Sequence, residues 1–224
     1  MIRPIDLGVC HGYEYEGDPA RTAIALPGSM LAGMPVLAFA IQGALSKGWR
    51  VIQVWDEFLD RSRDPTAWTR ARLEAAIAFA AADDLLVIAK SLTTRAAGLA
   101  AERGLPAIWL TPLLNDPDSV EMLRARTARA LLIGGSADPI WDDALARELS
   151  EDVVELDGAD HGLARVGDCQ AVASWERSRN SSQTWITRQP RLTAPWIANA
   201  RTGMPASIDP GSAIAVRAGS PSYS

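Results

Sequence analysis

The sequence is poor in the residues on which metal and redox chemistry depend. Its 224 residues include two cysteines and two histidines. Cys10 and Cys169 are not in CxxC spacing, so neither a zinc ribbon nor a redox motif is predicted. A mechanism that needs an imidazole has only His11 and His161 to draw on. The N-terminus also lacks the apolar core of a signal peptide, so a cytoplasmic location is expected by default.

Acidic residues outnumber basic residues in this chain. Lysine and arginine together number 22 against 27 acidic residues, which gives a net charge of −5. A chain of this charge lacks the overall electrostatic footprint of a protein that binds nucleic acid or an anionic membrane. The expected partner is therefore a small-molecule substrate, and the oligomeric state is left open. Apolar residues make up 48% of the chain, which indicates a globular protein rather than a disordered or collagen-like one.

One apolar stretch is long enough to cross a membrane. The 25 residues between Arg21 and Lys47 carry no charge, and their number meets the length of a membrane-spanning helix. Two prolines and three glycines interrupt the stretch. We therefore interpret it as a strand, a turn and a buried helix, with a membrane helix as the less favoured alternative because membrane helices tolerate proline and glycine.

Strand-like and helix-like segments alternate from residue 21 to about residue 166. Apolar runs predict strands at 21–28, 49–58, 84–91, 105–114, 129–139 and 153–162. Helical spacing and stop signals predict helices at 35–47, 66–82, 92–104, 118–126 and 142–150. This alternation predicts an α/β fold with a doubly wound, mainly parallel sheet and helices on both faces. Functional side chains in such folds gather at the carboxyl ends of the strands.

Three residues at predicted strand ends have the chemistry of a hydrolase. Ser91 lies at a strand-to-helix junction, where a helix N-terminus favours negative charge. A serine hydroxyl needs a base, which His161 can supply, and the imidazole needs a carboxylate, which Asp138 can supply. Four other aspartates compete for the last role, and Asp138 is favoured by its place at a strand end; the competitors are Asp142, Asp143, Asp157 and Asp160.

The segments LPGS, AKSL, IGGSADPIWD and GADHG resemble those of small α/β-hydrolase fold proteins of the serine esterase type. The resemblance runs from about residue 22 to residue 168, and the order serine, aspartate, histidine is that of the family. It implies an oxyanion hole made by the backbone of Ser29 or Met30 together with Leu92. Residues 112–130 leave room for one short helix, so no large cap is expected and the site should be open. The implied activity is hydrolysis of small carboxylic esters or thioesters, with acyl transfer as an alternative use of the same groups.

The turn around Ser91 departs from the family pattern G-x-S-x-G. Ala89 and Thr93 stand where the pattern has glycine, and Thr93 is larger and β-branched. This departure motivates a different class of function, a catalytically inert hydrolase-like protein that binds a ligand or partner. Simpler roles also remain open for each residue: Ser91 as a helix cap, Asp138 as a turn residue and His161 as a surface residue.

The remaining motifs do not predict a cofactor, metal or second nucleophile site. Gly28 to Gly33 has phosphate-loop spacing but lacks the following Lys-Ser/Thr, and Gly134-Gly135 is not a dinucleotide fingerprint, so no cofactor is expected. No metal site is expected either. Adjacent side chains such as Cys10 and His11 rarely form a nucleophile–base pair. Trp109 and Trp141 are candidates for the rim of the site, although packing in the core is favoured.

The composition changes near residue 169. Residues 170–224 contain nine serines, five prolines and six arginines, but no lysine and two acidic residues. We therefore expect residues 1–169 to form the hydrolase-like domain and residues 170–224 an irregular or disordered tail. A partner-binding extension and a frameshifted reading of a GC-rich gene are the two explanations considered for the tail.

Overall fold

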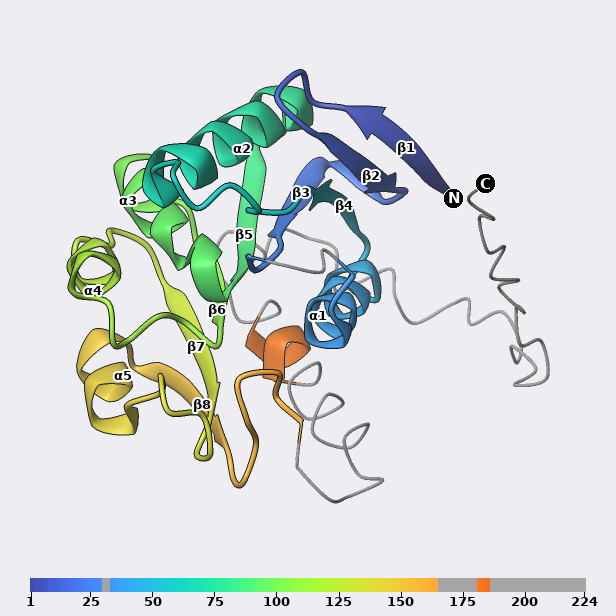
Figure 1. The fold of residues 1–224 in the computed structure, drawn as a ribbon. Helices are drawn as coiled ribbons and strands as arrows, with labels where there is room; N and C mark the ends of the chain where they lie inside the picture. The colour runs from blue at the N-terminus through green and yellow to red at the C-terminus, as the bar shows by residue number, and fades with distance from the viewer. Residues whose placement is uncertain (30–32, 165–180, 186–224) are drawn as a thin grey trace, which may run out of the picture. The chain divides into compact units, whose positions relative to one another are not determined.

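The computed structural model of the protein describes residues 1–29, 33–164 and 181–185. The predictions for Met30, for Cys169 and for most of the 170–224 tail therefore lie outside the described residues. Within the described ranges, the chain forms one mixed sheet with helices on both faces (Figure 1).

The sheet has eight strands in the order β1-β2-β4-β3-β5-β6-β7-β8. The strands from β4 and β3 to β8 are mutually parallel, whereas β1 and β2 are antiparallel to their neighbours. This confirms the predicted doubly wound, mainly parallel sheet. The strand bounds are β1 Ile2–Asp6, β2 His11–Tyr15, β3 Asp18–Leu26, β4 Trp49–Trp55, β5 Asp84–Lys90, β6 Ala107–Leu110, β7 Ala130–Gly135 and β8 Asp152–Leu156.

The hairpin of β1 and β2 is absent from the sequence-based prediction. Its hydrophobic pattern is inverted, because the two buried positions of β2 are Gly12 and Glu14. A Cβ on Gly12 would lie 2.5 Å from the carbonyl oxygen of Gln53, so only glycine permits this close approach to β4. The Glu14 carboxylate forms ion pairs with Arg3 and Arg50, which compensates for its burial.

The helices divide unequally between the two faces of the sheet. One face is covered by α2 (Pro65–Ala80), the 3₁₀ helix η1 (Ser91–Ala96) with α3 (Ala97–Glu102), α4 (Pro117–Arg124) and α5 (Asp143–Leu149). The other face is covered by α1 (Pro35–Leu45), whose apolar side chains pack on β3, β4 and β5. Figure 1 shows α1 on one side of the sheet and α2, α3, α4 and α5 on the opposite side.

The helix starts follow ordinary capping chemistry. Asp64, Asp116 and Asp142 precede α2, α4 and α5, and each carboxylate accepts a hydrogen bond from a main-chain amide in the first turn. Proline occupies the first turn of α1, α2 and α4, where its missing N–H costs nothing.

The uncharged stretch after Arg21 contains the end of β3 and the whole of α1, which confirms the strand and the helix of the strand–turn–helix interpretation. No helix within the described residues is long and apolar enough to span a bilayer.

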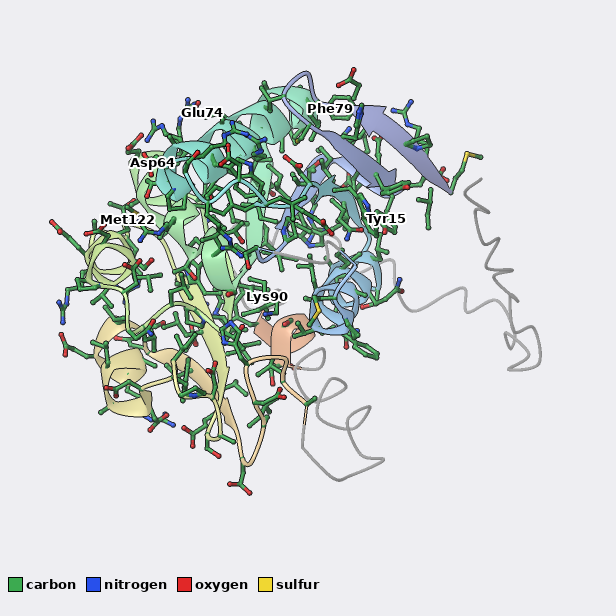
Figure 2. The ribbon with its side chains drawn as sticks, in the orientation of Figure 1. Tyr15, Asp64, Glu74, Phe79, Lys90 and Met122 are labelled. Carbon is green, nitrogen blue, oxygen red and sulfur yellow. The ribbon has the colours of Figure 1, made fainter. Side chains whose placement is uncertain are left out.

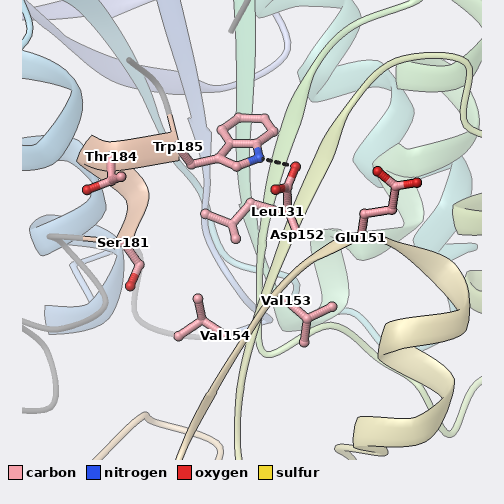
Figure 3. Close-up of a pocket in the computed structure, with 8 residues that line it drawn as sticks. All are labelled: Leu131, Glu151, Asp152, Val153, Val154, Ser181, Thr184 and Trp185. Carbon is pink, nitrogen blue, oxygen red and sulfur yellow. Dashed lines mark hydrogen bonds between the residues drawn. The ribbon is translucent and has the colours of Figure 1, made fainter. Parts of the chain in front are cut away.

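A short segment of the predicted tail belongs to the domain. Residues 181–185 are helical, and the indole of Trp185 is buried on the α1 face of the sheet with Leu131 and Leu156. Its Nε1 donates a hydrogen bond of 2.8 Å to the Asp152 carboxylate at the start of β8 (Figure 3). An indole that is only 4% exposed is part of the core, so residues 181–185 pack on the sheet.

Candidate active site

Ser91 lies on a sharp turn between β5 and η1. Strand β5 ends at Lys90, and the next residue has a φ of +52° before the chain enters the 3₁₀ helix. A positive φ is unfavourable for a residue with a Cβ, so the surrounding structure must hold it. The turn lifts the Ser91 hydroxyl above the carboxyl end of the central strands, in the way a nucleophile elbow does.

Thr93 takes the place of the second glycine of the elbow pattern and is buried. Its Oγ1 accepts a 3.0 Å hydrogen bond from the amide of Lys90 and lies 3.0 Å from the carbonyl oxygen of Lys90. The hydroxyl thereby forms hydrogen bonds with the main-chain amide and carbonyl of Lys90, on the strand side of Ser91. Ala89, at the first glycine position, is 1% exposed and lies in the core on the face that α2 and α3 cover.

His161 connects Ser91 with Asp138. Its Nε2 lies 2.8 Å from Ser91 Oγ, and its Nδ1 lies 2.7 Å from Asp138 Oδ2. The Asp138 side chain is fully buried, whereas that of His161 is 32% exposed. The structure thus brings the three predicted residues into a continuous hydrogen-bonded chain from a buried carboxylate to a hydroxyl at the protein surface.

The turn after β7 orients Asp138. The other carboxylate oxygen, Oδ1, accepts a 2.9 Å bond from the amide of Ile140, and the Asp138 amide donates to Gly135. Trp141 follows, and its ring packs directly on Gly134, where a Cβ would lie 2.0 Å from the ring. Trp109 is buried in the core, as the favoured reading predicted.

The competing aspartates have other partners. Asp142 caps α5, and Asp143 pairs with Arg147 one turn later in the same helix. Asp160 accepts hydrogen bonds from the amides of Gly162 and Ala164, which shape the loop that carries His161. Asp157 lies near the hydroxyl of Ser136 at an exposed turn. Among the described residues, Asp138 is the carboxylate that contacts the imidazole.

Of the predicted oxyanion-hole residues, Ser29 directly follows a glycine that lies beside the elbow, and Leu92 directly follows the candidate nucleophile. Gly28 lies next to Ser91, because a Cβ on Gly28 would be 3.7 Å from the Ser91 Cβ. The carbonyl of Ser29 accepts a 3.0 Å hydrogen bond from the amide of Phe58, which anchors the turn after β3. Leu92 lies in the first turn of η1, where amides have no acceptor within the helix.

The second histidine and the described cysteine lie elsewhere. His11 begins β2 opposite Trp55 of β4, and two further strands, β4 and β3, separate β2 from β5. Burial and the nearby Asp56 carboxylate raise the pKa of the Cys10 thiol to about 11. Almost no thiolate forms near neutral pH, so Cys10 is not an activated nucleophile.

Lys90 was not singled out from the sequence, yet its side chain lies inside the site. It is 5% exposed, and its Nζ donates a 3.3 Å hydrogen bond to the main-chain carbonyl of His161. Burial lowers the pKa of Lys90 to about 8, against the opposing attraction of Asp138 and Asp160. The available signal was a single lysine that ends a buried apolar run, immediately before the candidate nucleophile.

Comparison with known proteins gives a likeness of structure rather than of sequence. No protein-family model matches the chain, and no curated protein matches it significantly. An α/β serine hydrolase homologue from Coxiella burnetii is 13% identical, with a TM-score of 0.63 over 83% of this chain and 97% of that one. Est1E of Butyrivibrio proteoclasticus, solved with ferulic acid bound, is 12% identical, with a TM-score of 0.65 over 84% of this chain and 98% of that one.

A serine hydrolase without a lid from Xanthomonas campestris is 18% identical, with a TM-score of 0.62 over 85% of this chain and 95% of that one. At these identities the likeness is one of fold. The chain has the α/β-hydrolase fold.

Within this fold, the segment between β6 and β7 holds one eight-residue helix, α4. Val120 and Leu123 of α4 pack into the core, so this helix covers the sheet and forms no large cap, as predicted.

Proposed function

We propose that the protein is a serine hydrolase that acts on small carboxylic esters or thioesters. The observation that carries the proposal is the continuous chain of hydrogen bonds Ser91–His161–Asp138, built on a turn where Ser91 has a positive φ. The α/β-hydrolase fold and the serine hydrolases and esterases among its structural neighbours support it.

The geometry suits general-base activation of Ser91. His161 Nε2 is at hydrogen-bond distance from Ser91 Oγ, so it can take the hydroxyl proton as Oγ attacks the carbonyl carbon. Asp138 accepts from Nδ1, which fixes the tautomer and stabilises the imidazolium that forms. The backbone amides of Leu92 and of the turn at Ser29 are the donors we assign to the oxyanion, and one such donor contributes about 3–4 kcal/mol to the transition state.

Collapse of the tetrahedral intermediate completes the first half-reaction. The bond between the carbonyl carbon and the leaving oxygen or sulfur breaks, and the imidazolium returns its proton to the departing alcohol or thiol. A water molecule then attacks the acyl-Ser91 ester with His161 again as base. If an alcohol replaces water in this step, the product is a new ester, which is the acyl-transfer alternative.

The short β6–β7 segment supports a preference for small, accessible substrates. With α4 packed on the sheet, the described residues between β6 and β7 form no large cap that could enclose an acyl chain. We therefore expect short-chain aryl esters and thioesters to be cleaved faster than long-chain triglycerides. Cleavage of long-chain triglycerides alone would contradict the assignment.

An ester and thioester panel tests the proposal on the wild type, Ser91→Ala and His161→Ala. We expect turnover by the wild type and its loss in both variants, with circular dichroism showing that the variants fold. Equal activity in all three proteins would remove the assignment. A folded wild type that cleaves no substrate and reacts with no serine-directed probe would favour the inert, ligand-binding alternative that the atypical elbow residue Thr93 suggests.

A further inference from the structure

The side chain of Lys90 joins three parts of the site. It leaves β5 at its carboxyl end (Figure 2), and its Cδ lies 3.9 Å from the position of a Cβ on Gly28. Its Nζ then reaches the main-chain carbonyl of His161 at 3.3 Å. One side chain thus runs from the residue before the nucleophile, past the turn after β3, to the loop that carries the base.

Other hydrogen bonds hold the His161 loop to itself and to the turn after β7. Asp160 bonds to the amides of Gly162 and Ala164, and the amide of Leu163 bonds to the carbonyl of Asp160. These bonds shape the loop but do not connect it to β5. The bond from Lys90 does, and its acceptor is the carbonyl of the same residue whose imidazole contacts Ser91.

We propose that Lys90 is a positioning residue: its ammonium group ties the His161 loop to the nucleophile elbow and so keeps the imidazole at hydrogen-bond distance from Ser91. The inference rests on the proposed function. A charge-assisted hydrogen bond is stronger than a neutral one, so the attachment is strongest while Lys90 carries its proton.

The charges and the burial around Lys90 define the pH range in which its ammonium group holds the His161 loop. Asp138 and Asp160 face it and favour the ammonium form, His161 is its hydrogen-bond partner, and burial outweighs the two carboxylates. The described residues of the turn after β3 and of β6 add no titratable side chain. With the pKa of Lys90 lowered to about 8, the ammonium is present at pH 7 and half lost near pH 8. Positioning therefore weakens as the pH rises through about 8.

The chain offers a matched control, because it contains two lysines and the other, Lys47, is exposed. We expect Lys90→Met to lower kcat at pH 7 by about tenfold, the lower end of the range for loss of a hydrogen bond made by a charged group, with little change in KM. Lys47→Met should match the wild type. We also expect kcat/KM of the wild type to fall above about pH 8 and this alkaline limb to be absent from Lys90→Met.

Two measurements are independent of turnover. Hydrogen–deuterium exchange at constant pH should be faster in Lys90→Met than in Lys47→Met for the peptide that contains residues 157–164. In the wild type labelled with [ε-¹³C]lysine, NMR should show one resonance that titrates near pH 8 and disappears in Lys90→Met.

Unchanged kcat together with unchanged exchange in Lys90→Met would overturn the proposal. A Lys90 titration whose midpoint differs from that of the alkaline limb would also overturn it, and this test needs only the wild type. If the wild type cleaves no ester, the proposed function fails, and the exchange result still decides whether Lys90 holds the loop.

Discussion

The hydroxyl of Thr93 accepts a 3.0 Å hydrogen bond from the amide of Lys90, across the turn that carries Ser91. Size alone makes threonine a poor residue for this turn, because the family pattern has glycine there. The structure shows a specific partner for this hydroxyl. Threonine at position 93 therefore departs from the sequence motif, but it also supplies a hydrogen bond that holds the elbow.

We expect Thr93→Val to lower the free energy of unfolding by about 1–3 kcal/mol, because it keeps the shape of the side chain but leaves the buried Lys90 amide without this acceptor. Thr93→Ser keeps the hydroxyl and loses one methyl group, so about 1 kcal/mol or less is expected. Urea denaturation of both variants gives the comparison. A Thr93→Val protein as stable as the wild type would show that the bond does not support the elbow.

Asp138→Asn tests the role of the carboxylate. Asparagine can still accept from the Ile140 amide, so the fold should persist, but it does not stabilise the imidazolium or hold the required tautomer. We expect kcat to fall by about 10³–10⁴-fold. Asp142→Asn is the control, because asparagine caps a helix as well as aspartate does and activity should not change. Similar losses in both variants would contradict the assignment of Asp138.

The sequence was sufficient to predict the parallel part of the sheet and the three hydrogen-bonded side chains. Strands β3 to β7 each contain a run of buried, mainly apolar residues, and the strands from β3 to β8 alternate with helices, which is a strong pattern. The β1–β2 hairpin could not be predicted in this way, because its inward positions hold Gly12 and Glu14 rather than apolar residues. Glu14 is tolerated there because Arg3 and Arg50, which are distant in sequence, pair with it.

The roles of Lys90 and Trp185 also depend on contacts that no local pattern reports. The sequence places Lys90 at the end of a strand, but its burial depends on the turn at Gly28 and on the His161 loop, which is 71 residues away. Trp185 lies in a segment whose composition indicates a tail, but its partners Leu131 and Asp152 belong to strands β7 and β8.

Gly134 is predicted to be intolerant of any side chain. A methyl group there would overlap the ring of Trp141, so we expect Gly134→Ala to destabilise the protein by about 1–3 kcal/mol. Gly98→Ala provides a control of opposite sign. The added methyl would lie 3.5 Å from Met122, an ordinary contact, and alanine in a helix is favoured over glycine by about 1 kcal/mol. If thermal melts show that both substitutions change the melting temperature in the same direction, this account of the packing at Gly134 is contradicted.

Trp185→Ala tests whether residues 181–185 belong to the domain. Loss of a buried indole should cost about 3–5 kcal/mol of unfolding free energy. Trp185→Phe keeps most of the apolar contact and loses the bond to Asp152, whose carboxylate still pairs with Arg129, so about 1 kcal/mol is expected. If denaturation of Trp185→Ala matches that of the wild type, the segment contributes nothing to the core.

The central claim is that Ser91 is an activated nucleophile, and labelling with a fluorophosphonate tests it most directly. The reagent forms a covalent bond with an activated serine, and trypsin cleavage after Lys90 and Arg95 places Ser91 in a short peptide, residues 91–95, for mass spectrometry. We predict that the label is found on this peptide in the folded wild type and is absent from Ser91→Ala and from denatured wild type. A folded wild type without label, or equal labelling of Ser91→Ala, would contradict the account.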